Sequence, residues 1–235
     1  MDGITLFNAD ALETIKTFSD KSIDLIVTDP PYDIAVDENC GGMLERKGVG
    51  KSFKQLKDSD IVSGYDIKSY GKEFFRILKT VDLYIWCNKK QIPEYLDFYV
   101  LQNECLFEIL TWHKTNALPN LVNKYITDTE FLLYFHKKGG FCQPNSYEDG
   151  KSYFMSLINL KDKKVWHHPT IKPLEFTKRV IRNSSREGET VLDCFMGSGT
   201  TGVACKELNR NFIGIERNPE FFKAASIRLG EESLW

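Results

Sequence analysis

The amino-acid sequence predicts an α/β fold, in which a single domain is built around a mostly parallel β-sheet. Short apolar runs alternate along the chain with stretches whose apolar residues recur every three or four positions, as in amphipathic helices. The run 23–28 is apolar almost throughout, which is typical of a strand buried on both faces. The length of 235 residues suits one domain with a small insertion, so 1–235 is predicted to be one catalytic domain.

The first half of the chain supplies strands and helices in alternation. A helix is predicted over 10–18 because Leu12, Ile15 and Phe18 fall on one face. Apolar runs predict strands, and amphipathic spacing predicts two further helices. The strands are expected at 4–7, 23–28 and 83–87, and the further helices at 65–78 and 93–101.

The second half continues the alternation. A helix is predicted over 173–182, with Pro173 at its start, where a missing N–H is tolerated. Further helices are expected at 200–208 and 219–229, and strands at 107–112, 130–135, 191–194 and 212–216.

Two segments show no clear periodicity. The segment 33–63 is polar, contains glycine and is too long for an ordinary connection, so a mobile functional loop is predicted there. The segment 137–167 is weakly patterned and is predicted to be a small insertion.

Composition excludes several classes of protein. The hydrophobic fraction of 42% argues against disorder, and the net charge of -2 argues against a globally basic nucleic-acid binder. No apolar run is long enough to cross a membrane, and no signal pattern opens the chain. The six cysteines form no C-x-x-C pair, so reduced thiols in the cytoplasm of a bacterial or phage-infected cell are expected. His167 and His168 lack a third ligand at suitable spacing, so no metal is predicted.

A glycine loop near the C-terminus carries the strongest binding signal. Gly197, Gly199 and Gly202 form G-x-G-x-x-G directly after a predicted strand and at the start of a predicted helix. Glu216 follows Gly197 by 19 residues, close to the spacing of an acid that accepts ribose hydroxyls. The pattern predicts an adenosine-type ligand; the alternative is a tight turn with a solvated Glu216. The loop lacks the lysine of a phosphate-binding P-loop.

The polar residues around this loop suit an adenosine ligand that carries an amino acid. Thr200 and Thr201 stand where a helix start can hold a carboxylate. Asp193, at the end of the preceding strand, suits an ammonium group.

The sequence Asp29-Pro30-Pro31-Tyr32 closes the strand predicted at 23–28. That strand is expected beside the strand at 191–194, which places Asp29 and Gly197 at neighbouring carboxyl ends, where ligands bind in open α/β sheets. The Asp29 carboxylate and the Pro30 carbonyl can accept both hydrogens of a planar exocyclic amine. Tyr32 offers a face on which a base can stack. The alternative is a rigid turn with a packed tyrosine.

Together, these motifs resemble the amino-methyltransferases of DNA, in the group whose catalytic motif precedes the cofactor loop. The matching segments are NADAL at 8–12, DPPY at 29–32, HPTIKP at 168–173, DCFMGSGTTG at 193–202 and FIGIERNPEFF at 212–222. The resemblance implies S-adenosylmethionine as cofactor and a circularly permuted Rossmann-like fold whose seven-stranded sheet has one antiparallel strand. It also implies direct methyl transfer to a base flipped out of duplex DNA.

The resemblance also assigns roles to individual residues. The catalytic residues are Asp29, Pro30, Pro31 and Tyr32. Asp10 and Ala11 meet the adenine of the cofactor, and Phe195 lies beside its methionyl part. The complete cofactor-binding set is Asp10, Ala11, Asp29, His168, Thr170, Lys172, Asp193, Phe195, Gly197, Ser198, Gly199, Thr200, Thr201, Glu216 and Arg217.

Two basic segments flank the predicted site. The segment 151–186 has nine basic and two acidic residues, and 44–57 has five basic and one acidic residue. Contacts to DNA phosphates are predicted there. The candidates are Arg46, Lys47, Lys51, Lys54, Lys161, Lys163 and Lys164. The resemblance places target recognition in 137–167 and allows a homodimer.

The resemblance leaves other activities open. The aspartate of the catalytic motif favours adenine N6 as the methyl acceptor, whereas a serine there is commoner among enzymes that methylate cytosine N4. An RNA or protein-amide methyltransferase uses related motifs. A nicotinamide-dependent oxidoreductase would use the glycine loop but leaves DPPY and HPTIKP unexplained.

Overall fold

The fold was analysed in a computed structural model that describes residues 3–31, 65–117, 125–158, 165–166 and 171–230. Eight strands form one sheet in the order β1-β8-β7-β2-β3-β5-β4-β6. They are β1 (Ile4–Phe7), β2 (Leu25–Thr28), β3 (Asp82–Cys87), β4 (Leu106–Lys114), β5 (Thr129–His136), β6 (Tyr153–Ser156), β7 (Thr190–Asp193) and β8 (Asn211–Ile215). Among these strands β5 alone runs antiparallel to its neighbours, as predicted.

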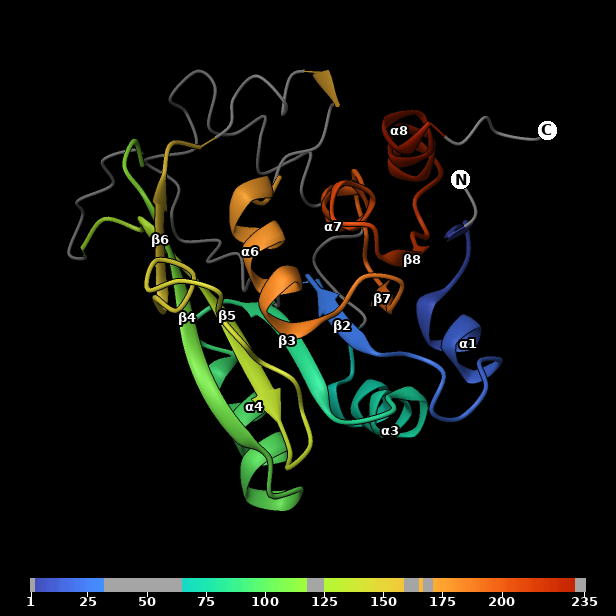
Figure 1. The fold of residues 1–235 in the computed structure, drawn as a ribbon, viewed down its shortest axis with the longest axis horizontal. Helices are drawn as coiled ribbons and strands as arrows, with labels where there is room; N and C mark the ends of the chain where they lie inside the picture. The colour runs from blue at the N-terminus through green and yellow to red at the C-terminus, as the bar shows by residue number, and fades with distance from the viewer. Residues whose placement is uncertain (1–2, 32–64, 118–124, 159–164, 167–170, 231–235) are drawn as a thin grey trace, which may run out of the picture.

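Helices cover both faces of the sheet (Figure 1). One face packs against α1 (Ala11–Lys16), α3 (Ile67–Ile77), α4 (Ile92–Leu96) and the π-helix η1 (Asp97–Gln102). The other face packs against α6 (Leu174–Ser184), α7 (Thr200–Glu207) and α8 (Pro219–Leu229). The sheet is therefore the middle of three layers, with an apolar core on each side.

The predicted order of elements is confirmed, with two differences. The sheet has eight strands instead of seven because Tyr153–Ser156, inside the segment predicted as an insertion, pairs with the end of β4. The helix predicted over 93–101 is α4 followed by a π-helical turn. Within the described residues, no helix is long and apolar enough to cross a membrane.

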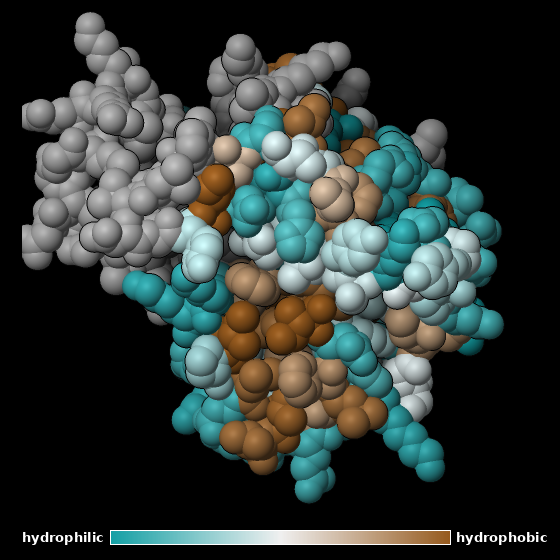
Figure 2. Space-filling model, turned by 90° about the vertical axis from the view of Figure 1, so that its left-hand side faces the viewer, coloured by the Kyte–Doolittle hydropathy of each residue, from teal (hydrophilic) through white to brown (hydrophobic). Residues whose placement is uncertain are grey.

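Apolar side chains remain exposed where η1 meets the first half of β4. Leu101 and Leu106 are 76% and 60% exposed, and Phe107 and Ile109 are more than one-third exposed. Because β6 pairs only with Thr111–Lys114, the start of β4 lies at the sheet edge. Figure 2, viewed toward this side of the molecule, shows an apolar area on its lower part.

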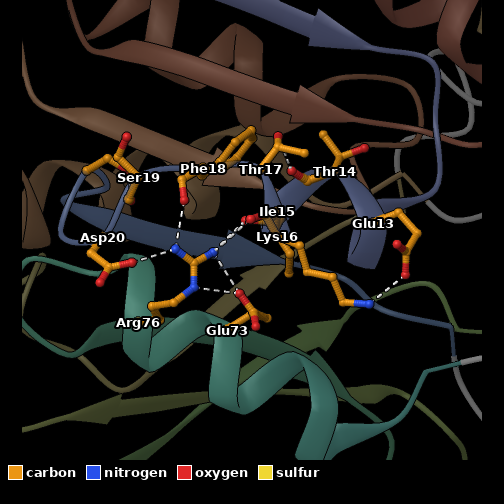
Figure 3. Close-up of polar contacts among 11 residues, drawn as sticks. Glu13, Thr14, Ile15, Lys16, Thr17, Phe18, Ser19, Asp20, Glu73 and Arg76 are labelled. Carbon is orange, nitrogen blue, oxygen red and sulfur yellow. Dashed lines mark hydrogen bonds and ion pairs between the residues drawn. The ribbon is translucent and has the colours of Figure 1, made fainter.

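Arg76 on α3 fastens the C-terminal end of α1 (Figure 3). Its guanidinium donates to the main-chain oxygens of Ile15 at 2.9 Å and Phe18 at 2.7 Å. It also pairs with Asp20 and Glu73, each at 2.7 Å. These contacts bring a charged donor to carbonyls at and just beyond the end of α1, and they fix α1 against α3.

Replacing Arg76 should destabilise the fold because two helix-end carbonyls lose a charged donor. We expect Arg76→Ala to lower the free energy of unfolding by about 2–3 kcal/mol. Arg76→Lys keeps the charge but loses the forked geometry, so its loss should be smaller. Lys16→Ala, which removes an exposed ion pair with Glu13, should leave stability unchanged. Urea denaturation followed by circular dichroism measures all three; equal losses for alanine and lysine would contradict the role of the fork.

Candidate active site

The candidate active site lies where β2 and β7 end side by side. These strands pair in parallel, with Leu25 opposite Val191 and Ile26 opposite Leu192. Their carboxyl ends therefore bring the Asp29 motif and the glycine loop together, as the sequence predicts. A pocket opens between them, and its lining comes from both motifs and from the start of α6. The lining residues are Val27, Thr28, Asp29, Trp86, Ile171, Lys172, Thr177, Asp193, Phe195, Met196, Gly197, Ser198, Thr200 and Thr201.

Glycines allow the sharp turn between β7 and α7. Gly197 and Gly199 have φ angles of 50° and 79°, a backbone conformation that other residues rarely adopt. Gly202 lies inside α7 for a different reason, since a Cβ there would come within 2.7 Å of the Phe212 ring. The three glycines thus form the turn and allow α7 to pack closely against the sheet.

Asp193 is a buried carboxylate at the end of β7. It accepts hydrogen bonds from the hydroxyls of Thr201 at 2.6 Å and Thr28 at 3.0 Å. The Phe195 amide donates a third bond at 3.1 Å. Burial raises the pKa of Asp193 to about 7, although these donors act in the opposite direction. A cationic group placed beside this carboxylate would favour its ionised form.

Glu216, just beyond β8, is fixed against the glycine loop. Its carboxylate accepts from the amides of Gly197 at 3.0 Å and Asn218 at 2.7 Å. Burial raises the pKa of Glu216. Asn8 donates to the main-chain oxygens of Glu216 at 2.8 Å and Arg217 at 3.1 Å, so the ends of β1 and β8 are joined. Glu216 is therefore oriented toward the loop and is not a solvated strand end.

The two threonines at the start of α7 have different partners. Thr201 donates its hydroxyl proton to Asp193. The hydroxyl oxygen of Thr200 instead accepts from Arg228 on α8 at 3.0 Å, and Arg228 also donates to the Ser198 carbonyl at 3.1 Å. Sequence reasoning missed Arg228 because its partners lie about 30 positions away, with no spacing that marks the contact.

Phe195 packs among aromatic side chains on the same side of the sheet as α3. Its ring centroid lies 5.7 Å from that of Tyr65 and 5.4 Å from that of Tyr70. Asp10 caps α1 by accepting from the Glu13 amide at 3.1 Å, and Ala11 is buried behind it. The predicted adenine contacts thus lie at the start of α1, near the end of β1.

Asp29 lies beside the Lys172 ammonium. Lys172 is predicted to bind cofactor, and its ammonium nitrogen lies 2.6 Å from an Asp29 carboxylate oxygen. The same nitrogen lies 3.2 Å from Glu130 on β5, a residue that sequence reasoning did not select. Pro30 is buried and Pro31 is half-buried directly after Asp29.

Several predicted residues lie outside the part of the chain that the structure describes. They are Tyr32, His168, Thr170 and all the candidate DNA contacts, namely Arg46, Lys47, Lys51, Lys54, Lys161, Lys163 and Lys164, together with the loop 33–63. Of the catalytic motif, Asp29, Pro30 and Pro31 are described. No cluster of three or more potential metal ligands occurs among the described residues.

The fold and the paired motifs define a class of enzyme, and comparison with known proteins identifies it. A family model described as "DNA methylase" matches residues 23–226, and the chain belongs to this family. A type II methyltransferase, M2.LlaDCHI of Lactococcus lactis subsp. cremoris, is 32% identical over 98% of this chain and 90% of its own length. M2.DpnII of Streptococcus pneumoniae is also 32% identical, over 97% of this chain and 90% of its own length.

A solved structure supports the same assignment. The structure titled as the M1.HpyAVI–SAM complex has a TM-score of 0.69 and 31% identity, and the match covers 96% of this chain and 98% of that one. PvuII DNA methyltransferase, titled cytosine-N4-specific, has a TM-score of 0.74 and 16% identity, covering 100% of this chain and 89% of that one. At that identity the second likeness shows the fold alone. Membership of the DNA methylase family argues against the nicotinamide-dependent oxidoreductase.

The raised pKa of Asp193 predicts a pH-dependent stability change. In the unfolded chain this carboxyl ionises near its ordinary pKa of about 3.9, but in the folded chain it stays protonated up to about 7. Its contribution to stability is therefore complete below the unfolded pKa and declines as pH rises toward 7. Asp193→Asn should gain about 1 kcal/mol over the wild type for each pH unit between 5 and 7. Urea denaturation at pH 5, 6 and 7 tests this; a constant difference would contradict it.

Proposed function

We propose that this DNA methylase transfers a methyl group from S-adenosylmethionine to the exocyclic N6 of adenine in duplex DNA. The observation that carries the proposal is the position of Asp29 at the end of β2, beside the glycine loop that follows β7. One motif suits an exocyclic amine, and the other suits an adenosine ligand that carries an amino acid. We also propose that residues 1–235 form a single methyltransferase domain.

The pocket residues fit S-adenosylmethionine. Asp193 suits the ammonium of its amino acid, and Thr200, at the start of α7, suits the carboxylate. Glu216 faces the loop and suits the ribose hydroxyls. The Thr201 hydroxyl donates to Asp193, so its proposed role is to orient that carboxylate toward the ammonium. Asp10, Ala11 and Phe195 complete the proposed adenosine and methionyl contacts.

The proposed mechanism is displacement without a covalent enzyme intermediate. S-adenosylmethionine, when bound, supplies an electrophilic methyl group on a sulfonium. The Asp29 carboxylate and the Pro30 carbonyl accept the two hydrogens of the target amine. This orientation directs the nitrogen lone pair away from the base ring and toward the place of the methyl group. The N–C bond would form as the C–S bond breaks, S-adenosylhomocysteine would leave, and one amine proton would pass to solvent. Tyr32 stacks on the flipped base and offsets part of the energy of unstacking.

The base assignment rests on the catalytic motif. The aspartate at position 29 favours adenine N6 over cytosine N4, because the resembling cytosine enzymes more often have serine there. Seven basic residues are proposed to contact DNA phosphates, with the loop 33–63 closing over the flipped base. They are Arg46, Lys47, Lys51, Lys54, Lys161, Lys163 and Lys164. Target recognition is proposed for 137–167. A homodimer is proposed as well, with the exposed apolar area at the start of β4 as its candidate surface.

The activity is tested with labelled S-adenosylmethionine, unmethylated duplex DNA and mass spectrometry of the nucleosides. We expect N6-methyladenine, and a loss of roughly 100-fold or more in Asp29→Ala because the acceptor for the amine hydrogens is removed. Asp97→Ala, an exposed acid on η1, is the matched control and should keep full activity. N4-methylcytosine would overturn the base assignment. Cofactor binding without a DNA product would move the proposal to RNA or protein.

The affinity for the cofactor should depend on the protonation of Asp193. Because its pKa is about 7, the ionised form that pairs with an ammonium is lost as pH falls. Calorimetric titration with S-adenosylhomocysteine, which has the same amino-acid end, should give about tenfold weaker binding at pH 6 than at pH 8. Asp193→Asn should bind weakly at both pH values. Asp82→Asn, at another buried aspartate with a raised pKa, should keep the wild-type dependence.

A further inference from the structure

A chain of four alternating charges runs along one end of the sheet, past the carboxyl ends of β2 and β4 and the amino end of the antiparallel strand β5. The Lys172 ammonium lies 2.6 Å from Asp29 and 3.2 Å from Glu130. The other oxygen of Glu130 lies 2.5 Å from the Lys114 ammonium. The order is therefore Asp29, Lys172, Glu130, Lys114, with two negative and two positive charges.

The two central members of the chain are well shielded from water. The side chain of Lys172 is 8% exposed and that of Glu130 is 20% exposed. The Lys172 ammonium also lies 5.1 Å from the centroid of the Trp86 ring, a distance suited to a cation–π contact. Buried charges are stable only when opposite charges compensate them, so removing one member weakens the compensation of its neighbours. The pair of lysines lowers the pKa of Glu130 to about 2, against the effect of burial.

The position of Lys172 constrains Asp29 directly. Asp29 must present carboxylate oxygens to the target amine in the proposed mechanism, and it can do so only in its ionised form. The ammonium beside it stabilises that form and fixes one of its oxygens. Glu130 has no place in the pocket lining, but it shares the same ammonium and therefore determines where that ammonium lies.

We propose that Lys172 and Glu130 are positioning residues for Asp29, and that Lys172 keeps the catalytic carboxylate ionised and oriented instead of serving as a cofactor ligand. This inference rests on the proposed function, because it assigns both residues to the same reaction. It changes the role that the sequence resemblance implies for Lys172. It also adds Glu130, which no motif marks.

The inference predicts how the reaction responds to pH once the ammonium is removed. In Lys172→Met, Asp29 and Glu130 face each other without the cation between them. Two carboxylates that share a site do not both ionise readily. Glu130 keeps its ion pair with Lys114, so Asp29 is the carboxylate expected to retain a proton to higher pH. When that proton is held by Asp29, the amine loses its acceptor and methyl transfer slows.

Other titratable groups pack around the chain of charges and must be separated from this effect. They are Cys87 on β3, Tyr95 on α4 and Asp193 on β7. Lys114 on β4 is itself a member of the chain. Burial raises the pKa of Cys87 to about 12 and raises the pKa of Tyr95 well above its ordinary value, so both stay neutral from pH 6 to 9. Saturating cofactor keeps Asp193 in one ionisation state. A change in kcat with pH then reports on the ionisation of Asp29 and Glu130.

The test compares kcat across pH 6–9 at saturating cofactor for five proteins. They are the wild type, Lys172→Met, Lys172→Arg, the double variant Lys172→Met with Glu130→Gln, and Lys178→Met. We expect kcat of Lys172→Met, relative to the wild type, to fall by about tenfold per pH unit on the acidic side. The dissociation constant of the cofactor should change by less than about twofold.

The remaining variants separate positioning from a merely structural role. Lys172→Arg keeps a cation and should follow the pH profile of the wild type. The double variant lacks the second carboxylate and should regain that profile at a lower rate. Lys178→Met removes an ion-paired lysine of α6 that lies outside the pocket, bound to Glu175 and Glu207, and should change neither quantity. A wild-type pH profile in Lys172→Met, or a loss confined to cofactor affinity, would overturn the inference.

Thermal unfolding gives a readout that needs no activity. Relative to the wild type, Lys172→Met should lose stability as pH rises from 5 to 8, because Asp29 and Glu130 then ionise without the ammonium between them. The added Glu130→Gln should remove this trend, and a trend unchanged by Glu130→Gln would overturn the coupling. A wild-type chain that binds S-adenosylmethionine but methylates no DNA would refute the proposed function instead, and the unfolding data would then decide the coupling alone.

Discussion

The parallel pairing of β2 with β7 is the contact on which the rest of the site depends. It joins strands from opposite ends of the chain, and the Thr28 hydroxyl donates to Asp193 at 3.0 Å where both strands finish. The helix after β7 packs on one face of the sheet, whereas α3, between β2 and β3, packs on the other. The pocket therefore lies at the carboxyl ends of two neighbouring strands, between layers of helices on opposite faces of the sheet.

The two aspartates that line the pocket, Asp193 and Asp29, have different neighbours. Asp193 is held by hydroxyl and amide donors, and burial raises its pKa to about 7. Asp29 has the Lys172 ammonium at 2.6 Å. An acid without a bonded cation suits a ligand that brings a positive charge, whereas an acid with its own cation suits a neutral amine. The two ends of the proposed reaction are thus separated by electrostatic environment as well as by position.

Local patterns predicted most of the fold and the two motifs whose residues line the pocket. The strand, loop and helix around Gly197 and Gly199 are consecutive in sequence, and Glu216 follows 19 residues after Gly197, so this part of the site is marked by spacing in the sequence alone. The strand β6 was missed because its four residues, at the sheet edge, show little periodicity. Its pairing depends on β4, a segment about 40 positions earlier.

Charged contacts between distant elements escaped prediction for a related reason. Glu130 and Lys114 stand at strand ends, where charged residues are usually solvated, and nothing local indicates their ion pair. The register of β4 with β5 places their strands side by side, with Trp112 opposite Glu130. Had the pairing of β4 with β5 been predicted, the ion pair of Lys114 with Glu130 could have been predicted as well. The link from Glu130 through Lys172 to Asp29 can be seen only in the three-dimensional structure.

The chain of charges also connects two regions that the backbone keeps apart. Lys114 lines a surface depression together with residues of β4, β6 and the segment before β5, among them His113, Ile126 and Met155. Through Glu130 and Lys172, the charge in that depression is coupled to Asp29, because buried ion pairs are poorly screened. A ligand that drew Lys114 away would leave Glu130 to compete with Asp29 for the Lys172 ammonium, and it would change the surroundings of the carboxylate that the proposed reaction uses. The Lys172 ammonium therefore links the charge in the surface depression to the Asp29 carboxylate.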